Sequence, residues 1–254
     1  MNTIASSFLA LIIPCYKESV RLPRFLPILA ETLADIDCTI QVVDDGSPPN
    51  EVNAIRSLVE EMRIRFPRII SPLLALPSNQ GKGAAVRAGW MKHSASTLLG
   101  FVDADGAISP QEVYRFISIA SASPEKAYFA SRIRMLGRKV DRSFLRHLYG
   151  RVFATASSLS LKLPVYDTQC GLKIVPSQIF QNGKAPFEER GFAFDLELLV
   201  ALVDGGFSIQ EIPIDWTHVS GSKINLIRDS LAMYLSLNRI SRNRTKWTLP
   251  NKIK

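Results

Sequence analysis

The sequence predicts an α/β fold, a mostly parallel sheet with helices on both faces. Short apolar runs alternate along the first half of the chain with stretches whose apolar residues recur at helical spacing. That alternation is typical of buried parallel strands joined by crossover helices. The chain has 254 residues, of which 46% are hydrophobic and 21% charged. These values suit a globular domain with a full apolar core.

The first half supplies regular elements in strict alternation. Residues 9–14 are a continuous apolar run, and leucine and phenylalanine then recur at intervals of three and four residues over 22–33. Ser109 followed by Pro110 marks a helix start, because serine caps a first turn and proline fits its first position. The expected strands are 9–14, 39–43, 69–76, 98–102 and 128–131, and the expected helices are 22–33, 51–65, 81–93 and 111–120.

The second half is less regular. We expect helices over 144–161 and 194–203, and strands over 168–175 and 207–216. Apolar residues over 224–240 have the spacing of an amphipathic helix, which continues into a basic tail. The predicted organisation is one domain over residues 1–222, followed by an extension over 223–254.

Positive charge is concentrated in two segments of a chain whose net charge is +8. Residues 131–151 contain seven Lys or Arg and one acid, and residues 239–254 contain six and no acid. Such segments suit nucleic acid, an anionic membrane surface or a phosphorylated substrate. Nucleic acid is disfavoured, because neither a helix-turn-helix pattern nor a basic pattern interleaved with aromatic residues is present.

The apolar runs and the cysteines also narrow the possibilities. No run reaches the roughly 18–20 apolar residues of a membrane span. Cys15, Cys38 and Cys170 are scattered and form no C-x-x-C pair. They favour a reducing compartment over a disulfide framework or a zinc site.

Polar clusters follow three of the predicted strands. Tyr16 and Glu18 follow the first, Asp44 and Asp45 the second, and Asp103-Ala104-Asp105 the fourth. Parallel strands end at one edge of a sheet, where ligands of open α/β sheets bind. We therefore expect these clusters to converge there. Two carboxylates such as Asp103 and Asp105 can address one hard cation beside substrate phosphates.

Each cluster also has a structural interpretation. A solvated acidic loop would explain Asp103 and Asp105, and an Asp-Gly turn would explain the segment after the second strand. The glycines on either side of Lys82 allow close backbone approach, and a helix N-terminus there favours an anion. Their spacing matches neither the P-loop pattern nor the dinucleotide-binding pattern.

The order of these motifs resembles that of family 2 glycosyltransferases of the GT-A fold. Downstream motifs resemble the polyprenyl-phosphate branch of that family, and most of all the dolichyl-phosphate β-glucosyltransferases. The resemblance covers about residues 11–239. The upstream motifs are Pro14-x-Tyr16-x-Glu18, Val43-Asp44-Asp45-Gly46-Ser47, Asn79-x-Gly81-Lys82-Gly83 and Asp103-x-Asp105. The downstream motifs are Ser131-Arg132, Asp167-Thr168-Gln169-Cys170-Gly171-Leu172-Lys173, Phe194-Asp195-Leu196-Glu197-Leu198-Leu199 and Trp216-Thr217-x-x-x-Gly221-Ser222-Lys223.

This resemblance implies an inverting transfer of glucose from UDP-glucose to a polyprenyl or dolichyl phosphate, with Mg²⁺ or Mn²⁺ as cofactor. It implies that Asp103 and Asp105 hold the metal and, with Arg132, are the catalytic residues. The implied donor-binding residues are Pro14, Tyr16, Glu18, Asp44, Asp45, Lys82 and Lys223. The implied acceptor-phosphate residues are Arg132, Arg142 and Arg146, and the implied sugar-pocket residues are Asp167 and Gln169. Asp195 and Glu197 do not share a helix face, so one is expected to reach the site and the other to be structural.

The basic extension is expected to lie on an anionic leaflet. That would make the protein cytoplasmic and peripheral at the cytoplasmic face of a membrane. The alternative is a helix packed on the core with a solvated tail. Two other activities stay open: a family 2 enzyme with a non-lipid glycan or glycoside acceptor, and a nucleotidyltransferase, which also uses paired acids and a metal.

Overall fold

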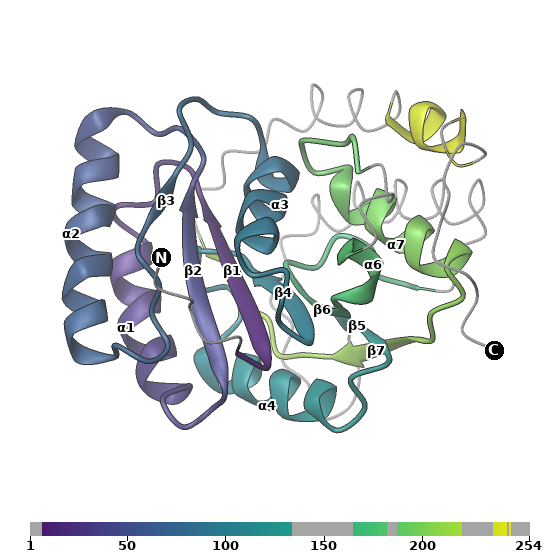
Figure 1. Ribbon diagram of the computed structural model, residues 1–254, viewed down its shortest axis with the longest axis horizontal. Helices are drawn as coiled ribbons and strands as arrows, with labels where there is room; N and C mark the ends of the chain where they lie inside the picture. Colours follow the sequence, from purple (N-terminus) through teal and green to yellow (C-terminus); the bar gives the residue numbers. More distant parts are fainter. Residues whose placement is uncertain (1–6, 134–164, 182–186, 220–235, 243, 245–254) are drawn as a thin grey trace.

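The computed structural model describes residues 7–133, 165–181, 187–219, 236–242 and 244. A seven-stranded sheet of order β3-β2-β1-β4-β6-β5-β7 forms its centre (Figure 1). The strands are β1 (Leu9–Cys15), β2 (Cys38–Asp44), β3 (Leu74–Ala75), β4 (Leu98–Val102), β5 (Ala127–Ser131), β6 (Leu172–Pro176) and β7 (Ile209–Pro213). The helices are α1 (Leu22–Thr32), α2 (Pro49–Arg65), α3 (Lys82–Lys92), α4 (Pro110–Ser121), α6 (Gln178–Gln181) and α7 (Phe194–Asp204).

The strand directions bring several chain segments to one edge of the sheet. β1 to β5 and β7 share one direction, whereas β6 runs antiparallel to both of its neighbours, β4 and β5. Val102, the last residue of β4, pairs with Leu172, the first residue of β6. The segment before β6 therefore meets the ends of β1, β2, β4 and β5. We call this side of the sheet the carboxyl edge.

Helices cover both faces of the sheet, as the sequence predicted. Leu9, Leu11 and Ile13 of β1 pack into an apolar cluster with α1, α2 and α4, and the alternate residues Ala10 and Ile12 pack into a second cluster with α3 and α7. Figure 1 shows α3 beside β1. A Cβ at Gly89 of α3 would lie 2.8 Å from Ile12 Cδ1, so the missing side chain lets this helix approach the sheet closely.

The expected elements agree with these bounds to within two residues, apart from three strands and the segments not described. The strand predicted over 207–216 is shortened to β7 (Ile209–Pro213). The predicted helix start before α4 is confirmed, because Ser109 Oγ accepts the N–H of Glu112. The strand predicted over 69–76 is reduced to β3, and the one predicted from 168 begins at 172. The expected helix over 144–161 and residues 224–235 lie outside the described residues, whereas residues 236–242 are helical. Within the described ranges, no helix has the length and apolar character needed to cross a bilayer.

Candidate active site

Four unpaired polar atoms mark the carboxyl edge as a binding site. They are the buried side-chain atoms that have no hydrogen-bond partner within the described residues. Asp44 Oδ1 and Ser131 Oγ belong to the last residues of β2 and β5, and Thr168 Oγ1 and Gln169 Nε2 lie just before β6. A buried polar atom without a partner is costly. Their gathering at one edge therefore points to a polar ligand.

Asp103 and Asp105 stand side by side after β4. The Asp103 side chain is 41% exposed, and its Oδ1 lies 2.8 Å from Lys82 Nζ. Asp105 Oδ1 accepts the N–H of Ala107 at 3.0 Å. Burial, together with the charge of Asp103, raises the pKa of Asp105. A shared cation would relieve this repulsion.

The donor atoms of this pair suit a hard divalent cation. Carboxylate oxygens are the ligands that Mg²⁺ and similar ions take, usually one or two per site, with water and substrate phosphates completing the shell. In the part of the chain that the structure describes, no group of three or more His, Cys, Asp or Glu side chains is placed to hold a metal. The pair therefore fits a cation that is bound jointly by protein and substrate.

Asp44 is the last residue of β2 and Asp45 follows it, and the two carboxylates have different surroundings. Both carboxylate oxygens of Asp45 accept backbone N–H groups, from Gln80 at 2.8 Å and Gly81 at 2.7 Å. Asp45 thereby fixes the turn that opens α3, and burial raises its pKa. Asp44 Oδ2 accepts the N–H of Ser47, and Oδ1 is one of the four unpaired atoms. Both residues lie at the carboxyl edge, and Asp44 has the unpaired oxygen.

The loop after β1 contributes Tyr16 and Glu18. Glu18 is buried and accepts from Arg21, at 2.6 Å from Nε and also from Nη2. Lys17 has a positive φ of 57° and donates its N–H to Ser47 Oγ, which joins the loops after β1 and β2. Tyr16 is half-buried, with the Lys17 ammonium 5.2 Å from its ring centre. Pro14, in β1, lies beside Val43 of β2.

Lys82 opens α3 and lies between two carboxylates. Its Nζ is 2.8 Å from Asp103 and 3.6 Å from Asp195 of α7. Burial lowers the pKa of Lys82, but the two carboxylates outweigh burial and raise it. Gly81, just before it, has a φ of +98°, and a Cβ there would lie 2.5 Å from the Arg190 carbonyl oxygen. The helix start is thus pressed against the loop that precedes α7.

A second lysine lies beneath the first and was not among the predicted site residues. Lys173 of β6 is fully buried, and its Nζ donates to Asp195 at 2.6 Å and to the Cys170 carbonyl at 2.7 Å. The rings of Phe101 and Phe129 lie 5.3 and 5.2 Å from this ammonium. A lysine inside an apolar strand is the sequence signal that indicates such a buried ion pair.

Asp195 and Glu197 point to different surroundings, as their spacing on the helix predicted. Asp195 faces the two lysines, whereas Glu197 accepts the N–H groups of Glu188 and Glu189 at 2.8 and 3.0 Å. Burial raises the pKa of Glu197 to about 7. Asp195 therefore faces Lys82 and Lys173, and Glu197 holds the loop before α7.

Arg132, which directly follows β5, and Asp167, in the loop before β6, form a two-point ion pair. Arg132 donates from Nε and Nη2 to the two carboxylate oxygens, at 2.7 Å each, and its backbone N–H adds a third bond at 3.0 Å. The guanidinium lies over Trp216, 5.7 Å from the ring centre. Burial lowers the pKa of Arg132, but the charge of Asp167 outweighs it and raises that pKa. Gln169 follows in the same loop, whereas Arg142, Arg146 and Lys223 lie outside the described residues.

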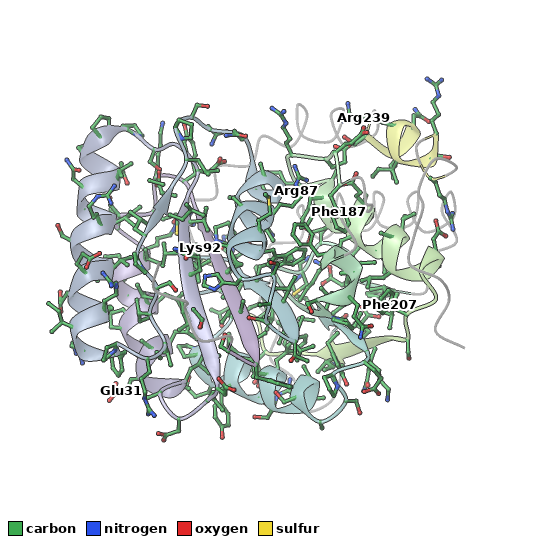
Figure 2. All side chains as sticks on the ribbon, viewed as in Figure 1. Glu31, Arg87, Lys92, Phe187, Phe207 and Arg239 are labelled. Carbon is green, nitrogen blue, oxygen red and sulfur yellow. The ribbon has the colours of Figure 1, made fainter. Side chains whose placement is uncertain are left out.

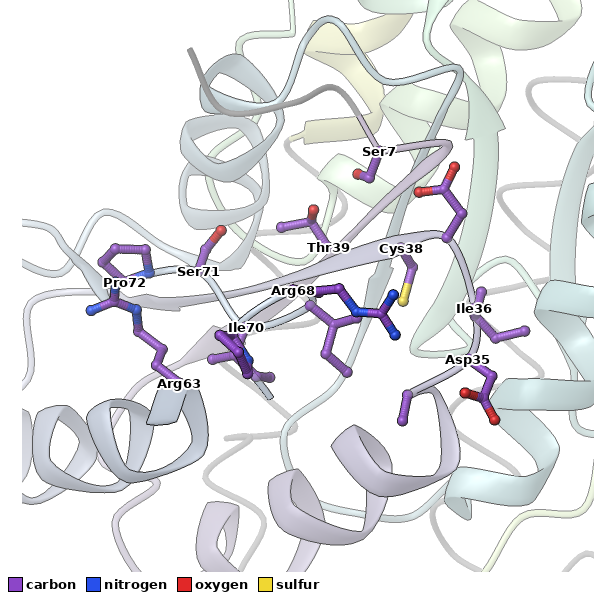
Figure 3. A pocket seen from close by; sticks show the side chains of 14 residues that line it. Ser7, Asp35, Ile36, Cys38, Thr39, Arg63, Arg68, Ile70, Ser71 and Pro72 are labelled. Carbon is purple, nitrogen blue, oxygen red and sulfur yellow. The ribbon is translucent and has the colours of Figure 1, made fainter. Parts of the chain in front are cut away.

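A separate pocket of about 650 Å³ lies at the opposite edge of the sheet, where β1 and β2 begin (Figure 3). Ser7, Cys38, Thr39, Arg68 and Ser71 line it. None of the predicted site residues borders this pocket. The acidic residues and the unpaired atoms therefore favour the carboxyl edge, and not this pocket, as the candidate active site.

This sheet and its acidic edge define the GT-A class of fold. The chain belongs to glycosyl transferase family 2, whose model matches residues 10–182, and it is a glycosyltransferase. A crystal structure of M. tuberculosis glucosyl-3-phosphoglycerate synthase in complex with Mn²⁺, UDP and phosphoglyceric acid has the same fold. Its TM-score is 0.63 at 15% identity, over 97% of this chain and 81% of that one.

Several curated relatives have names that refer to dolichyl or polyprenol phosphates. A dolichyl-phosphate β-glucosyltransferase of Trichomonas vaginalis is 31% identical over 85% of this chain and 65% of its own length. The enzyme of the same name from Dictyostelium discoideum is 29% identical over 94% of this chain and 75% of its own. A polyprenol monophosphomannose synthase of Mycolicibacterium smegmatis is 26% identical over 92% of this chain and 89% of its own.

Proposed function

We propose that this enzyme transfers glucose from UDP-glucose to a polyprenyl phosphate of the dolichyl type, with inversion at the anomeric carbon. The observation that carries the proposal is that paired carboxylates, at Asp103 and Asp105, share one sheet edge with the guanidinium of Arg132. The carboxylates suit a metal-bound diphosphate, and the guanidinium suits a second phosphate. The names of the T. vaginalis and D. discoideum relatives support the choice of sugar and acceptor.

The donor would bind over the ends of β1, β2 and β4. Asp103 and Asp105 would hold Mg²⁺ or Mn²⁺, which neutralises charge developing on the departing nucleoside diphosphate. Lys82 and the first N–H groups of α3 add positive potential at the same place. The proposed surroundings of the nucleoside are Pro14, Tyr16, Glu18, Asp44 and Asp45, with Lys223 as a further donor contact.

The acceptor phosphate would be the nucleophile. A phosphate monoester has a second pKa of about 6, so it is mainly dianionic at neutral pH. One of its oxygens forms a bond to the anomeric carbon while the bond from that carbon to the nucleoside diphosphate breaks. This step requires no proton transfer to a side chain.

Arg132 would orient the acceptor phosphate. Its ion pair with Asp167 offsets part of its charge, so the bound phosphate oxygen keeps its nucleophilic character. We propose Arg142 and Arg146 as further phosphate contacts. Asp167 and Gln169 would line the sugar pocket, where the unpaired Gln169 Nε2 is available to a hydroxyl.

The basic extension is proposed to contact an anionic leaflet at the cytoplasmic face of a membrane, where a lipid phosphate would be presented. Residues 239–254 contain six Lys or Arg. Two of these cations are engaged within the protein, since Arg239 pairs with Glu189 and Arg244 with Asp204. The three lysines of this segment, Lys246, Lys252 and Lys254, are the proposed membrane contacts.

Two measurements test this function. The first is the melting-temperature shift with UDP, GDP, CMP or ADP, each with and without Mn²⁺; a ligand at 100 times its Kd adds about 2.7 kcal/mol of stability. We expect a metal-dependent shift with UDP alone. The second is transfer of labelled glucose from UDP-glucose to a short-chain polyprenyl phosphate, with the matching polyprenol and 3-phosphoglycerate as controls.

The outcomes separate the alternatives. Transfer to the polyprenyl phosphate alone supports the proposal. Transfer to 3-phosphoglycerate or to a soluble glycan instead would move the enzyme to a non-lipid acceptor. Release of pyrophosphate from UTP would indicate a nucleotidyltransferase, and the absence of a shift with every nucleotide would contradict the donor site.

A further inference from the structure

Four charged side chains of alternating sign run from the core to the carboxyl edge. They are Lys173 on β6, Asp195 on α7, Lys82 on α3 and Asp103 after β4. The successive separations are 2.6, 3.6 and 2.8 Å. Exposure rises along the row, from 0% and 1% at the buried pair to 12% at Lys82 and 41% at Asp103. The inner end is thus enclosed by protein, and the outer end is open to a ligand.

The inner pair is rigidly held. The Lys173 ammonium has Asp195 on one side, the Cys170 carbonyl on another, and the rings of Phe101 and Phe129 beside it. Asp195 therefore has a fixed position and directs its second oxygen toward Lys82.

The outer pair occupies an oxygen that a metal would need. Lys82 Nζ lies on Asp103 Oδ1, and Asp103 with Asp105 forms the proposed cation site. Two cations in contact with one carboxylate repel each other strongly in a partly buried setting. Lys82 already has a second carboxylate, Asp195, at 3.6 Å, so only a small movement is required for it to change partner.

Building on the proposed function, we propose that Lys82 is a resident counter-ion of Asp103 that gives way when metal and donor diphosphate bind. Asp195 is the positioning residue that keeps the displaced ammonium beside the diphosphate. Metal alone must then compete with Lys82, whereas metal with a nucleoside diphosphate supplies a new anion for Lys82 to contact. Metal and nucleotide therefore bind cooperatively, and the coupling is reciprocal.

The test is a Mn²⁺ titration of the full chain, followed by electron paramagnetic resonance of the free ion, with and without UDP. The variant is Lys82→Met, which leaves Asp195 paired with Lys173. The control is Lys92→Met, which removes the same charge from the far end of α3 (Figure 2), about 15 Å away at 1.5 Å per residue.

For the wild type we expect UDP to tighten Mn²⁺ binding about tenfold or more. In Lys82→Met we expect Mn²⁺ alone to bind about tenfold more tightly and UDP to give little further gain. Lys92→Met should match the wild type. If Mn²⁺ alone binds Lys82→Met no better than the wild type, the counter-ion role is wrong. If the wild type binds no Mn²⁺ even with UDP, the proposed metal-dependent function fails instead.

The role of Asp195 needs a variant that leaves no buried charge unpaired. Replacing both members of the inner pair, Lys173→Met with Asp195→Asn, preserves net charge and is tolerated better than removing one partner. We expect this double variant to weaken the coupling between Mn²⁺ and UDP about fivefold, but to have no effect in the Lys82→Met background. An equal effect in both backgrounds would overturn the assignment.

Discussion

The position of Asp103 is set by the absence of a side chain at Gly171. A Cβ at position 171 would lie 1.9 Å from Asp103 Oδ2, well inside contact distance. The Asp103 backbone N–H also donates to the Gly171 carbonyl at 2.9 Å. The Asp103 carboxylate is therefore held in place by Gly171, the residue directly before the antiparallel strand β6.

Gly171→Ala is expected to displace the Asp103 carboxylate and lower kcat about a hundredfold, since a shift of about 1 Å can cost that much. Glucose transfer and Mn²⁺ binding would both be measured. Gly191→Ala is the matched control, because a Cβ there meets nothing within 4 Å. Equal activity of the two variants would show that Asp103 tolerates the methyl group.

Asp105→Asn should abolish most turnover while the fold survives. The amide keeps an oxygen that can accept the Ala107 N–H but loses the charge that a cation needs, so we expect kcat to fall at least about a hundredfold. Because burial and Asp103 raise the pKa of Asp105, the melting temperature should stay level or rise. Retained activity would remove Asp105 from the metal site.

Arg132→Lys tests acceptor binding separately from donor binding. Lysine keeps the charge but cannot make the two-point contact with Asp167. We expect KM for the polyprenyl phosphate to rise about tenfold, the effect of losing one charge-assisted hydrogen bond. The UDP–Mn²⁺ melting shift should be unchanged. Arg63→Lys, at an exposed pair with Glu60, is the control. A changed UDP shift would place Arg132 at the donor instead.

Continuous buried runs made most of the fold predictable. The fourth predicted strand, over 98–102, has the bounds of β4. The first predicted strand is one residue short at its end, and the second is one residue short at each end. The third was predicted too long. Pro72 interrupts the segment 69–76 and has no N–H to donate, so Ile70 makes only an isolated bridge before β3.

The site was predictable where it depends on strand ends and not where it depends on loop geometry. The rule that parallel strands end at one edge located Asp103, Asp105, Asp44 and Asp45. It did not predict that Asp45 uses both oxygens on the turn before α3. Alternation alone also does not reveal strand direction, so the antiparallel β6 was not foreseen.

The sequence also did not indicate which charged side chains pair with each other. Glu18 accepts a hydrogen bond from Arg21, three residues later. Both residues precede the predicted helix over 22–33, so helical spacing did not predict this pair. The Lys173–Asp195 pair joins residues 22 positions apart through a fold contact. Such partners are set by tertiary packing, which the local sequence does not record.

His93 should make the fold sensitive to acid. Burial, with the charge of Lys92, lowers the pKa of His93 to about 4. Its contribution to stability is full above its unfolded pKa of about 6.5 and is lost as pH falls through 4, a change of about 3 kcal/mol. His93→Gln should flatten the free energy of unfolding over that window, measured in urea. An unchanged pH dependence would contradict the assignment.

Removing residues 245–254 should weaken binding to anionic vesicles without unfolding the protein. The deletion spares the Arg239–Glu189 and Arg244–Asp204 ion pairs (Arg239 is labelled in Figure 2). It removes three lysines, each contributing about 1 kcal/mol at an anionic surface. Replacing Lys246, Lys252 and Lys254 with Gln should weaken binding comparably in a vesicle sedimentation assay. Unchanged sedimentation of both variants would count against the tail as an anchor.

The antiparallel insertion of β6 has a consequence for how this architecture can diversify. β5 ends and β6 begins at the same edge of the sheet, so the chain between them leaves and re-enters at one place. Its length and composition are thus independent of the sheet register, and lengthening a loop costs little. On the proposed function, changes within this connection that spare Asp167 and Gly171 would alter the acceptor while Asp103 and the nucleotide half keep their positions. Acceptor range would then change without a change in the pairing of the strands.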